Sequence, residues 1–314
     1  MSGDVQLLQI GSFTEEFNKR LTETYKVHRL WEQESPDDYL KEVGPEVDIV
    51  VTSGRYGCSA DIMRAAPKLK AIVSFGVGYD PIDIDTAREL NIAVSNTPDV
   101  LNDCVADLAM GLLISSARRI AEGDRFVRAG KWGSEPFPLG AKVSGKRLGI
   151  LGLGRIGKCI AQRANGFGME IHYHNRRQDP SVDYGYEETP ADLATWADFL
   201  IVTCVGGPST QGLVSREVME ALGPQGTLIN VSRGSVVDQP AMVELLESGR
   251  LGSAALDVFA DEPNVPSALL EMPQVVLVPH IASGTHETRK QMQDLVFDNL
   301  DSFIASGKLV TPVL

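Results

Sequence analysis

Short apolar runs alternate with amphipathic stretches along the chain. In its first third, apolar runs at positions 5–10, 47–51, 71–74 and 92–95 have the length and composition of buried strands. Stretches between them, such as 61–66 and 84–90, have the apolar spacing of helices. Strands that alternate with helices predict a parallel sheet covered on both faces.

A longer apolar pattern at 105–121 predicts one continuous helix, and a second series of strands and helices follows it. The predicted strands of this series are 147–151, 170–174, 199–203, 227–231, 254–258 and 275–278, with helices that include 156–164 and 240–248. Six strands separated by helices are typical of a doubly wound dinucleotide-binding domain. A last amphipathic helix, 288–305, precedes Gly307 and is expected to return to the first domain.

We therefore predict an α/β protein with two doubly wound parallel-sheet domains. A Rossmann domain for a dinucleotide would span 97–287, and a smaller flavodoxin-like domain for the substrate would combine 1–96 with 288–314. The 314 residues are enough for two domains, each with its own core.

Charge and cysteine content exclude several classes of partner. The formal net charge of −13 argues against general binding to nucleic acid or to an anionic membrane. The four cysteines are far apart and have no metal-binding spacing, so we predict no metal site and buried thiols in a reducing compartment. The sequence has neither a secretory signal nor an apolar run near the ~20 residues of a membrane span. We expect a cytoplasmic protein.

A glycine-rich loop follows the first strand of the second domain and opens a helix. Its residues are Gly152, Leu153, Gly154, Arg155, Ile156 and Gly157. In such a loop the first glycine permits a tight turn, the second lets the backbone approach a pyrophosphate, and the third lets the helix pack against the sheet. The helix N-terminus adds free N–H groups and a partial positive charge. The alternative is an ordinary strand-to-helix turn, but the context favours a nicotinamide dinucleotide site.

The end of the next strand bears on the choice between NADH and NADPH. NAD sites usually carry Asp or Glu there, whereas this chain has Asn175, Arg176 and Arg177. No carboxylate would repel a 2′-phosphate, and the two guanidinium groups could bind it. We predict that NADPH is preferred and that NADH is possible. The alternative is that both arginines are solvated surface charges.

Three ionisable residues follow other strands of the same domain: Arg233, Glu262 and His280. Ligands of open α/β sheets bind beyond the carboxyl ends of the strands, so these side chains are expected to meet the cofactor. Imidazole titrates near neutral pH, which suits His280 as a proton donor, and Glu262 would orient it and favour its charged form. Arg233 could bind a substrate carboxylate and polarise a ketone. Each also has an ordinary structural interpretation, as a core histidine, a turn residue or a surface charge.

The chain resembles the D-isomer-specific 2-hydroxyacid dehydrogenases over essentially its whole length. The matching segments are Ser74–Asp80, Val94–Val100, Val105–Asp107, the glycine loop, Asn230–Gly234, Leu256–Phe259 with Glu262–Pro263, and Pro279–His280. Within that family it is most similar to the glyoxylate/hydroxypyruvate reductases and the hydroxyphenylpyruvate reductases. Gly206–Pro208 supports this narrower placement less strongly. Many relatives have Pro-Leu-Thr where this chain has Val205–Gly207, which leaves details of the cofactor contact open.

The resemblance implies a set of residue roles. His280 would be the acid/base, Glu262 its partner and Arg233 the substrate anchor. The backbone N–H groups of Val77 and Gly78 would bind the substrate carboxylate, and Ser283 would touch the substrate. Further cofactor contacts would come from Val205, Val231, Ser232 and Asp257, the last through the nicotinamide amide. Relatives are commonly homodimers joined by the long helix and the arm after it, which contains Trp132.

We predict NADPH-dependent reduction of small 2-oxoacids, glyoxylate and hydroxypyruvate first, to the D-2-hydroxyacids. One alternative is a reductase of bulkier 2-oxoacids such as hydroxyphenylpyruvate or 2-ketogluconate. Oxidation of formate or phosphite and an L-lactate-type enzyme are weaker alternatives, the latter because its cofactor loop lies at the N-terminus. A non-enzyme alternative is a nucleotide-sensing, corepressor-like binding module.

Overall fold

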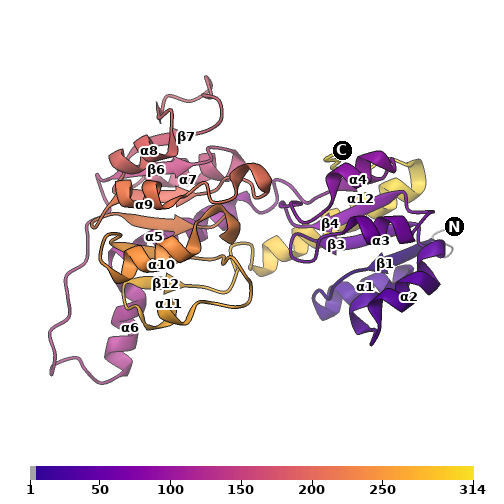
Figure 1. Ribbon diagram of the computed structural model, residues 1–314, viewed down its shortest axis with the longest axis horizontal. Coiled ribbons are helices and arrows are strands. Elements are labelled where there is room, and N and C mark those ends of the chain that lie inside the picture. Colours follow the sequence, from indigo (N-terminus) through magenta and orange to yellow (C-terminus); the bar gives the residue numbers. More distant parts are fainter. Residues whose placement is uncertain (1–4) are drawn as a thin grey trace. The chain divides into compact units, whose positions relative to one another are not determined.

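The computed structural model describes residues 5–314, which form two compact units (Figure 1). One contains the described residues up to Leu101 together with Thr285–Leu314, and the other contains Asn102–Gly284. Each unit has a parallel sheet of its own, with five strands in the first and seven in the second. The predicted fold class, two doubly wound parallel-sheet domains, is therefore confirmed.

The first unit has strand order β2-β1-β3-β4-β5, the order of flavodoxin-like domains. Its strands are β1 (Gln6–Gln9), β2 (Lys26–Arg29), β3 (Ile49–Ser53), β4 (Ala71–Phe75) and β5 (Ala93–Ser95). Its α-helices are α1 (Glu15–Thr24), α2 (Pro36–Val43), α3 (Ala60–Ala65), α4 (Ile84–Glu89) and α12 (His286–Ser306). α12 packs against β4, and a left-handed Gly307 (φ 70°) ends it, as the sequence predicts.

Strand β2 is missing from the sequence prediction. Its residues are mostly polar and none of them is buried, because it lies at the edge of the sheet. The central strands β3 and β4 are buried at every position, and both were predicted from their apolar runs.

The second unit has strand order β12-β11-β10-β9-β6-β7-β8. Renumbered from β6, this is the Rossmann order 3-2-1-4-5-6 with one more strand at the far edge. Its strands are β6 (Arg147–Leu151), β7 (Glu170–His174), β8 (Gly185–Tyr186), β9 (Phe199–Val202), β10 (Thr227–Asn230), β11 (Ser253–Leu256) and β12 (Val275–Leu277). The sequence predicts six of the seven. β8 has only two residues, too few for a periodic pattern.

The α-helices of the second unit begin at recognisable signals. They are α5 (Asn102–Ala117), α6 (Ile120–Arg128), α7 (Arg155–Asn165), α8 (Pro190–Trp196), α9 (Arg216–Leu222), α10 (Gln239–Glu247) and α11 (Ser267–Glu271). The side chains of Thr189, Ser215 and Asp238 cap α8, α9 and α10. A proline directly follows the capping residue of α8 and is the second residue after that of α10, and its fixed φ suits the first turn of a helix.

The single helix predicted over 105–121 is wrong at its C-terminal end. Arg119 has a left-handed backbone (φ 55°), which ends the run and separates α5 from α6. The carbonyl of Ala117 instead accepts a hydrogen bond of 2.7 Å from Ala141 N, where the chain returns to the helix end. Apolar spacing continues through the break, so the pattern alone did not reveal it.

Among residues 5–314, no helix combines the length and the apolar character that a bilayer crossing needs.

Candidate active site

The six predicted site segments of the second unit all lie at one edge of its sheet. Because the strands are parallel, their carboxyl ends share that edge. The neighbouring strands β10, β11 and β12 are followed by Arg233, Glu262 and His280. β6 is followed by the glycine loop, and it lies beside β9, where the strand order reverses. This switch point is the usual ligand site of such sheets.

The three glycines of the loop have different surroundings. Gly152 has φ 104°, and a Cβ there would lie 2.6 Å from the backbone nitrogen of Cys204. A Cβ on Gly157 would lie 2.5 Å from the carbonyl oxygen of Gly152. Both positions therefore exclude a side chain. A Cβ on Gly154 would meet nothing within 4 Å, so this residue faces open space.

Helix α7 begins directly after Gly154. Gly154 provides no capping side chain, and the first turn contains no acidic residue. Arg155 is exposed there, Ile156 is half-buried and Leu153 is buried. A helix N-terminus of this kind, with the open face at Gly154, fits the pyrophosphate of a dinucleotide.

Residues 175–181 after β7 form a loop that is fixed at both ends. The Asn175 Oδ1 atom accepts a hydrogen bond of 2.7 Å from Leu153 N, which fastens the loop to the glycine turn. At the other end, Tyr173 Oη accepts a hydrogen bond of 2.8 Å from Asp179 N. Arg176 and Arg177 lie between these anchors and are exposed. Among residues 5–314, no carboxylate forms an ion pair with the guanidinium group of Arg176 or Arg177.

The remaining predicted cofactor residues differ in exposure. Val205 is 69% exposed after β9, whereas Val231 and Ser232 are buried after β10. Thr203 was not predicted, but its hydroxyl donates a hydrogen bond of 2.6 Å to the carbonyl of Gly152. It therefore helps to fix the glycine turn, a role that its position at a strand end could have suggested.

The turn that carries Arg233 is built by Asn230. The Asn230 Oδ1 atom accepts hydrogen bonds from the backbone nitrogen (3.0 Å) and the hydroxyl (2.8 Å) of Ser232. Its Nδ2 donates to the carbonyl of Arg233 at 3.0 Å. A Cβ on Gly234 would lie 1.9 Å from the carbonyl carbon of Phe259. The absence of a side chain thus brings this turn against the loop that carries Glu262.

Glu262 and His280 form a direct pair. Glu262 Oε2 lies 2.7 Å from His280 Nδ1, and Glu262 Oε1 accepts a hydrogen bond of 3.1 Å from Phe259 N. Burial favours the neutral acid, but the hydrogen bond from His280, its charge and the nearby Arg233 together lower the pKa of Glu262. The carboxylate is therefore charged at neutral pH. Because Glu262 engages Nδ1, Nε2 is the ring nitrogen of His280 that can form a hydrogen bond to a ligand.

Asp257 fixes the backbone around His280. This residue has no exposed surface, and its carboxylate accepts hydrogen bonds from Ile281 N (2.6 Å) and Ala282 N (3.0 Å). The carbonyl of Asp257 also accepts from His280 N at 2.9 Å, and His280 has a left-handed backbone (φ 53°). Burial raises the pKa of Asp257. The expected contact of Asp257 with a nicotinamide amide stays a prediction.

The predicted substrate-binding residues Val77 and Gly78 belong to the first unit, in the turn after β4. Asn96 Nδ2 donates to the Val77 carbonyl at 2.8 Å, and Thr97 Oγ1 accepts from Gly76 N at 2.9 Å. In the described part of the chain, no hydrogen-bond acceptor pairs with the backbone N–H groups of Val77 and Gly78. Two such neighbouring N–H groups can bind an anion. Ser283 lies in the second unit, half-buried, three residues after His280.

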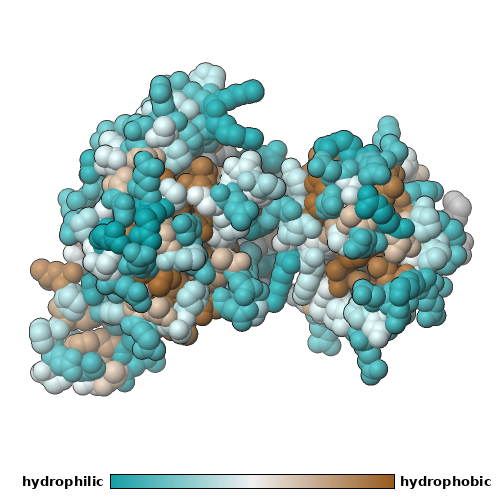
Figure 2. Space-filling model, in the orientation of Figure 1, coloured by the Kyte–Doolittle hydropathy of each residue, from teal (hydrophilic) through white to brown (hydrophobic). Residues whose placement is uncertain are grey.

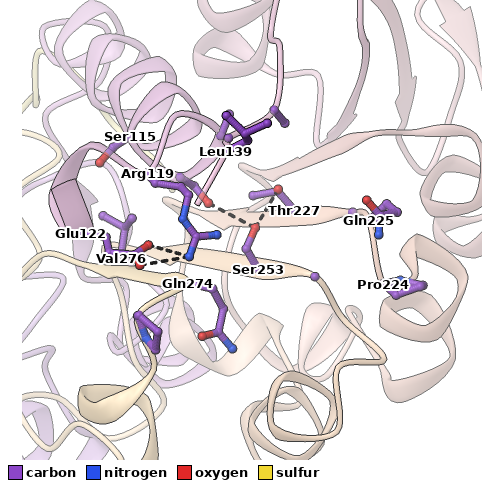
Figure 3. A pocket seen from close by; sticks show the side chains of 17 residues that line it. Ser115, Arg119, Glu122, Leu139, Pro224, Gln225, Thr227, Ser253, Gln274 and Val276 are labelled. Carbon is purple, nitrogen blue, oxygen red and sulfur yellow. Dashed lines mark hydrogen bonds and ion pairs between the residues drawn. The ribbon is translucent and has the colours of Figure 1, made fainter. Parts of the chain in front are cut away.

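A cavity of about 330 Å³ lies at the opposite edge of the seven-stranded sheet, at the amino ends of β10, β11 and β12 (Figure 3). Arg119 and Glu122 point toward each other there and form an ion pair of 2.8 Å. The hydroxyls of Thr227 and Ser253 are 2.8 Å apart. Its position at the amino ends separates this cavity from the residues predicted to carry the chemistry. Among the described residues, no group of three or more His, Cys, Asp or Glu side chains could hold a metal ion.

Comparison with known proteins identifies the family. The profile of the D-isomer specific 2-hydroxyacid dehydrogenase NAD-binding domain matches residues 110–282. The chain belongs to this family. It is 45% identical to a hydroxyphenylpyruvate reductase of Plectranthus scutellarioides, covering 94% of this chain and 95% of that protein. It is 43% identical to glyoxylate/hydroxypyruvate reductase A HPR2 of Arabidopsis thaliana, covering 99% of both.

A solved structure supports the same placement of this 2-hydroxyacid dehydrogenase. The NADPH-dependent glyoxylate/hydroxypyruvate reductase of Sinorhizobium meliloti, in complex with NADP and malonate, superimposes with a TM-score of 0.91. Its sequence is 39% identical, and the match covers 99% of this chain and 97% of that one. The predicted family and the nicotinamide-dependent oxidoreductase class are thus confirmed.

Proposed function

We propose that this dehydrogenase reduces small 2-oxoacids, with glyoxylate and hydroxypyruvate as first choices, to D-2-hydroxyacids at the expense of NADPH. The observation that carries the proposal is the Glu262–His280 pair, which lies at the same sheet edge as the glycine loop and Arg233. The names of the two similar reductases support the choice of substrates.

Each site residue receives a role from its contacts. A nicotinamide dinucleotide held by the glycine loop would supply the hydride for the carbonyl carbon. His280 donates a proton to the carbonyl oxygen from Nε2, because Nδ1 is held by Glu262. Arg233 binds the carboxylate and polarises the ketone. Asp257 positions the His280 backbone, and its contact with the nicotinamide amide remains part of the proposal.

The substrate carboxylate has a second proposed ligand in the amides of Val77 and Gly78. Their N–H groups are adjacent, and hydrogen bonds from Asn96 and to Thr97 hold the turn that presents them. Ser283 is the proposed side-chain contact near His280. Substitution of Gly78 by proline would remove one of the two N–H groups and is expected to raise KM for the oxoacid. An unchanged KM would remove these amides from the site.

The preference for NADPH rests on the loop after β7. Asn175 is engaged with the glycine turn and has no charge to repel a phosphate, and both following arginines are exposed. A charge-assisted hydrogen bond contributes about 1.5–3 kcal/mol, so even one such bond favours NADPH at least about tenfold. NADH remains a slower alternative.

Steady-state kinetics test both parts of this proposal. A panel of glyoxylate, hydroxypyruvate, hydroxyphenylpyruvate and 2-ketogluconate is compared by kcat/KM with each cofactor. We expect NADPH to exceed NADH at least about tenfold, and the two small oxoacids to exceed the bulky ones. Equal rates with NADH and NADPH would overturn the proposed cofactor preference. Faster reduction of a bulky oxoacid would make that oxoacid the preferred substrate in place of glyoxylate and hydroxypyruvate. Tight cofactor binding without any turnover would favour the binding-module alternative.

A homodimer is the proposed assembly. α6 is amphipathic, yet none of its residues is buried, and Val127 is 53% exposed. In the arm that follows, residues 129–145, Trp132 and Leu139 are 80% and 95% exposed. Figure 1 shows α6 and the arm extending away from the sheet of their own unit, and Figure 2 shows apolar atoms on this projection. Exposed apolar surface of this kind marks a protein interface, and a second copy carries the matching surface.

Sedimentation velocity measures the oligomeric state directly. The wild type is expected to sediment as a dimer, and the double variant Val127→Asp/Leu139→Asp as a monomer, because charges would replace buried apolar contacts. Val310→Asp is the matched control, since Val310 is 52% exposed in the first unit. A wild-type monomer, or a double variant that stays dimeric, would contradict the proposal.

We also propose a reducing, cytoplasmic location. The support is that no disulfide joins the four cysteines, Cys58, Cys104, Cys159 and Cys204. Only Cys58 is buried, so the expectation of buried thiols was wrong for the other three, which are half-buried. Burial raises the pKa of Cys58 to about 12 and that of Cys204 to about 11, which makes both unreactive. Cell fractionation tests the location, and recovery in an oxidising compartment would contradict it.

A further inference from the structure

The loop that presents the two cofactor arginines also contains a carboxylate, and that carboxylate is already occupied. Asp179 lies two residues after Arg177. Its Oδ2 lies 2.7 Å from Lys158 Nζ, on the second turn of α7. Its Oδ1 accepts hydrogen bonds from the backbone nitrogen (2.9 Å) and the hydroxyl (2.6 Å) of Ser181.

These contacts stabilise the charged form of the Asp179 carboxylate. The hydrogen bond from Lys158, followed by those from Ser181, lowers the pKa of Asp179 well below its usual range. Both carboxylate oxygens are thereby engaged. Arg176 and Arg177 are left without an ion pair in the described chain, although many other arginines of this acidic protein have one.

The position of the loop does not depend on Lys158. The Tyr173 hydroxyl holds the backbone of Asp179 from both sides, accepting from its N–H at 2.8 Å and donating to its carbonyl at 3.3 Å. Asn175 holds the other end through Leu153. Removal of the lysine would therefore free the Oδ2 atom of Asp179 without releasing the loop, while Ser181 keeps Oδ1. The freed oxygen would have guanidinium groups two and three residues away.

We propose that Lys158 is a specificity-determining residue for the cofactor, because it sequesters the Asp179 carboxylate and so keeps Arg176 and Arg177 available to a 2′-phosphate. This inference rests on the proposed NADPH preference. Lys158 acts through Asp179 and is a positioning residue, not a phosphate ligand. Without it, Asp179 competes with the phosphate for the same guanidinium groups.

Calorimetric binding of two cofactor fragments tests the proposal without any turnover. One fragment, 2′,5′-ADP, carries the 2′-phosphate, and the other, 5′-AMP, lacks it. For Lys158→Met we expect affinity for 2′,5′-ADP to fall about three- to tenfold at low ionic strength, with 5′-AMP affinity within about twofold of wild type. A merely structural role for the lysine would weaken both fragments alike. Loss of binding to both would therefore overturn the proposal.

The second substitution decides how Lys158 acts. Asp179→Asn in the Lys158→Met background is expected to restore 2′,5′-ADP affinity to within about twofold of wild type, since the competing charge is gone. Asp179→Asn alone is expected to leave that affinity at or above wild type. Failure to restore would mean that Lys158 attracts the phosphate by its own charge, and the proposal would be wrong. A selective loss in Asp179→Asn alone would refute it as well.

A control and a reference separate this inference from the NADPH proposal. Lys290 forms a similar exposed pair with Asp294, at 2.6 Å, in the first unit, and Lys290→Met should change neither affinity. If the wild type binds 2′,5′-ADP no better than 5′-AMP, the NADPH preference itself fails. If the wild type prefers 2′,5′-ADP and Lys158→Met keeps the same preference, only the role of Lys158 fails.

Discussion

Replacing Glu262 by glutamine tests whether its charge acts through His280. Glutamine can keep a hydrogen bond to Nδ1, 2.7 Å away in the wild type, but it carries no charge. A unit charge about 4 Å from an imidazolium contributes about 1 kcal/mol in water and about 4 kcal/mol at an effective dielectric constant of about 20. The side chains of Glu262 and His280 are 26% and 44% exposed, so solvent screening places the loss near about 1–2 kcal/mol. We expect kcat/KM to fall about 5- to 30-fold at neutral pH.

The pH profile gives the sign of the effect. The pKa of Glu262 is lowered by its contacts, so in the wild type this carboxylate stays charged across the neutral range. Glutamine carries no charge at any pH. The loss in kcat/KM is therefore expected to stay constant across neutral pH and to shrink only in acid, where the wild-type carboxylate becomes protonated as well.

A double-mutant cycle provides the result that would refute this reasoning. His280→Ala should lower kcat/KM about 10²- to 10⁴-fold, as expected for loss of a general acid. Adding Glu262→Gln to that variant should cost almost nothing further, because Glu262 acts only through the imidazole. Fully additive losses would show that Glu262 has an independent role. Asp261→Asn is the control, since it removes the neighbouring charge, whose contact is with Asn264.

Two further substitutions test the scaffold of the site. Gly234→Ala should destabilise the protein by about 1–3 kcal/mol in urea unfolding, because its Cβ would lie 1.9 Å from the Phe259 backbone. Gly111→Ala is the control and should not destabilise the protein, because its Cβ would meet nothing within 4 Å. Equal unfolding midpoints for the two variants would refute the predicted steric clash at Gly234. Asn175→Ala should raise KM for NADPH and NADH alike, about 3- to 10-fold, because the hydrogen bond that is lost holds Leu153 and not the 2′-phosphate. A selective rise for NADPH would mean that Asn175 binds the phosphate directly.

The sequence predicted the central strands of both sheets because those strands are buried on both faces. β3, β9 and β10 are continuous apolar runs, and each appears within a residue or two of its predicted bounds. Elements at the sheet edges were harder to predict. β2 is polar and half-exposed, and β8 has two residues. Neither has the periodicity on which the prediction depends.

The break between α5 and α6 shows a different limit. Helical spacing of apolar residues predicts where a helix can form, but α5 ends just before the left-handed residue Arg119, where a distant segment contacts the helix end. Ala117 accepts its hydrogen bond from Ala141, which lies 24 positions later. A local pattern does not contain that information.

Some residues of the site could likewise be predicted from the sequence, and others could not. Residues that follow parallel strands meet at one edge whatever the details of packing, so topology alone could bring Arg233, Glu262 and His280 together. The supporting groups could not be found in this way. Asp257 is next to its strand like the others, and the family resemblance gave it a cofactor contact. Its complete burial and its bonds to Ile281 and Ala282 add a role that the sequence did not predict, which is to fix the His280 backbone. A carboxylate's position along the chain predicts which edge of the sheet it reaches, but the donors that surround it there come from the tertiary structure.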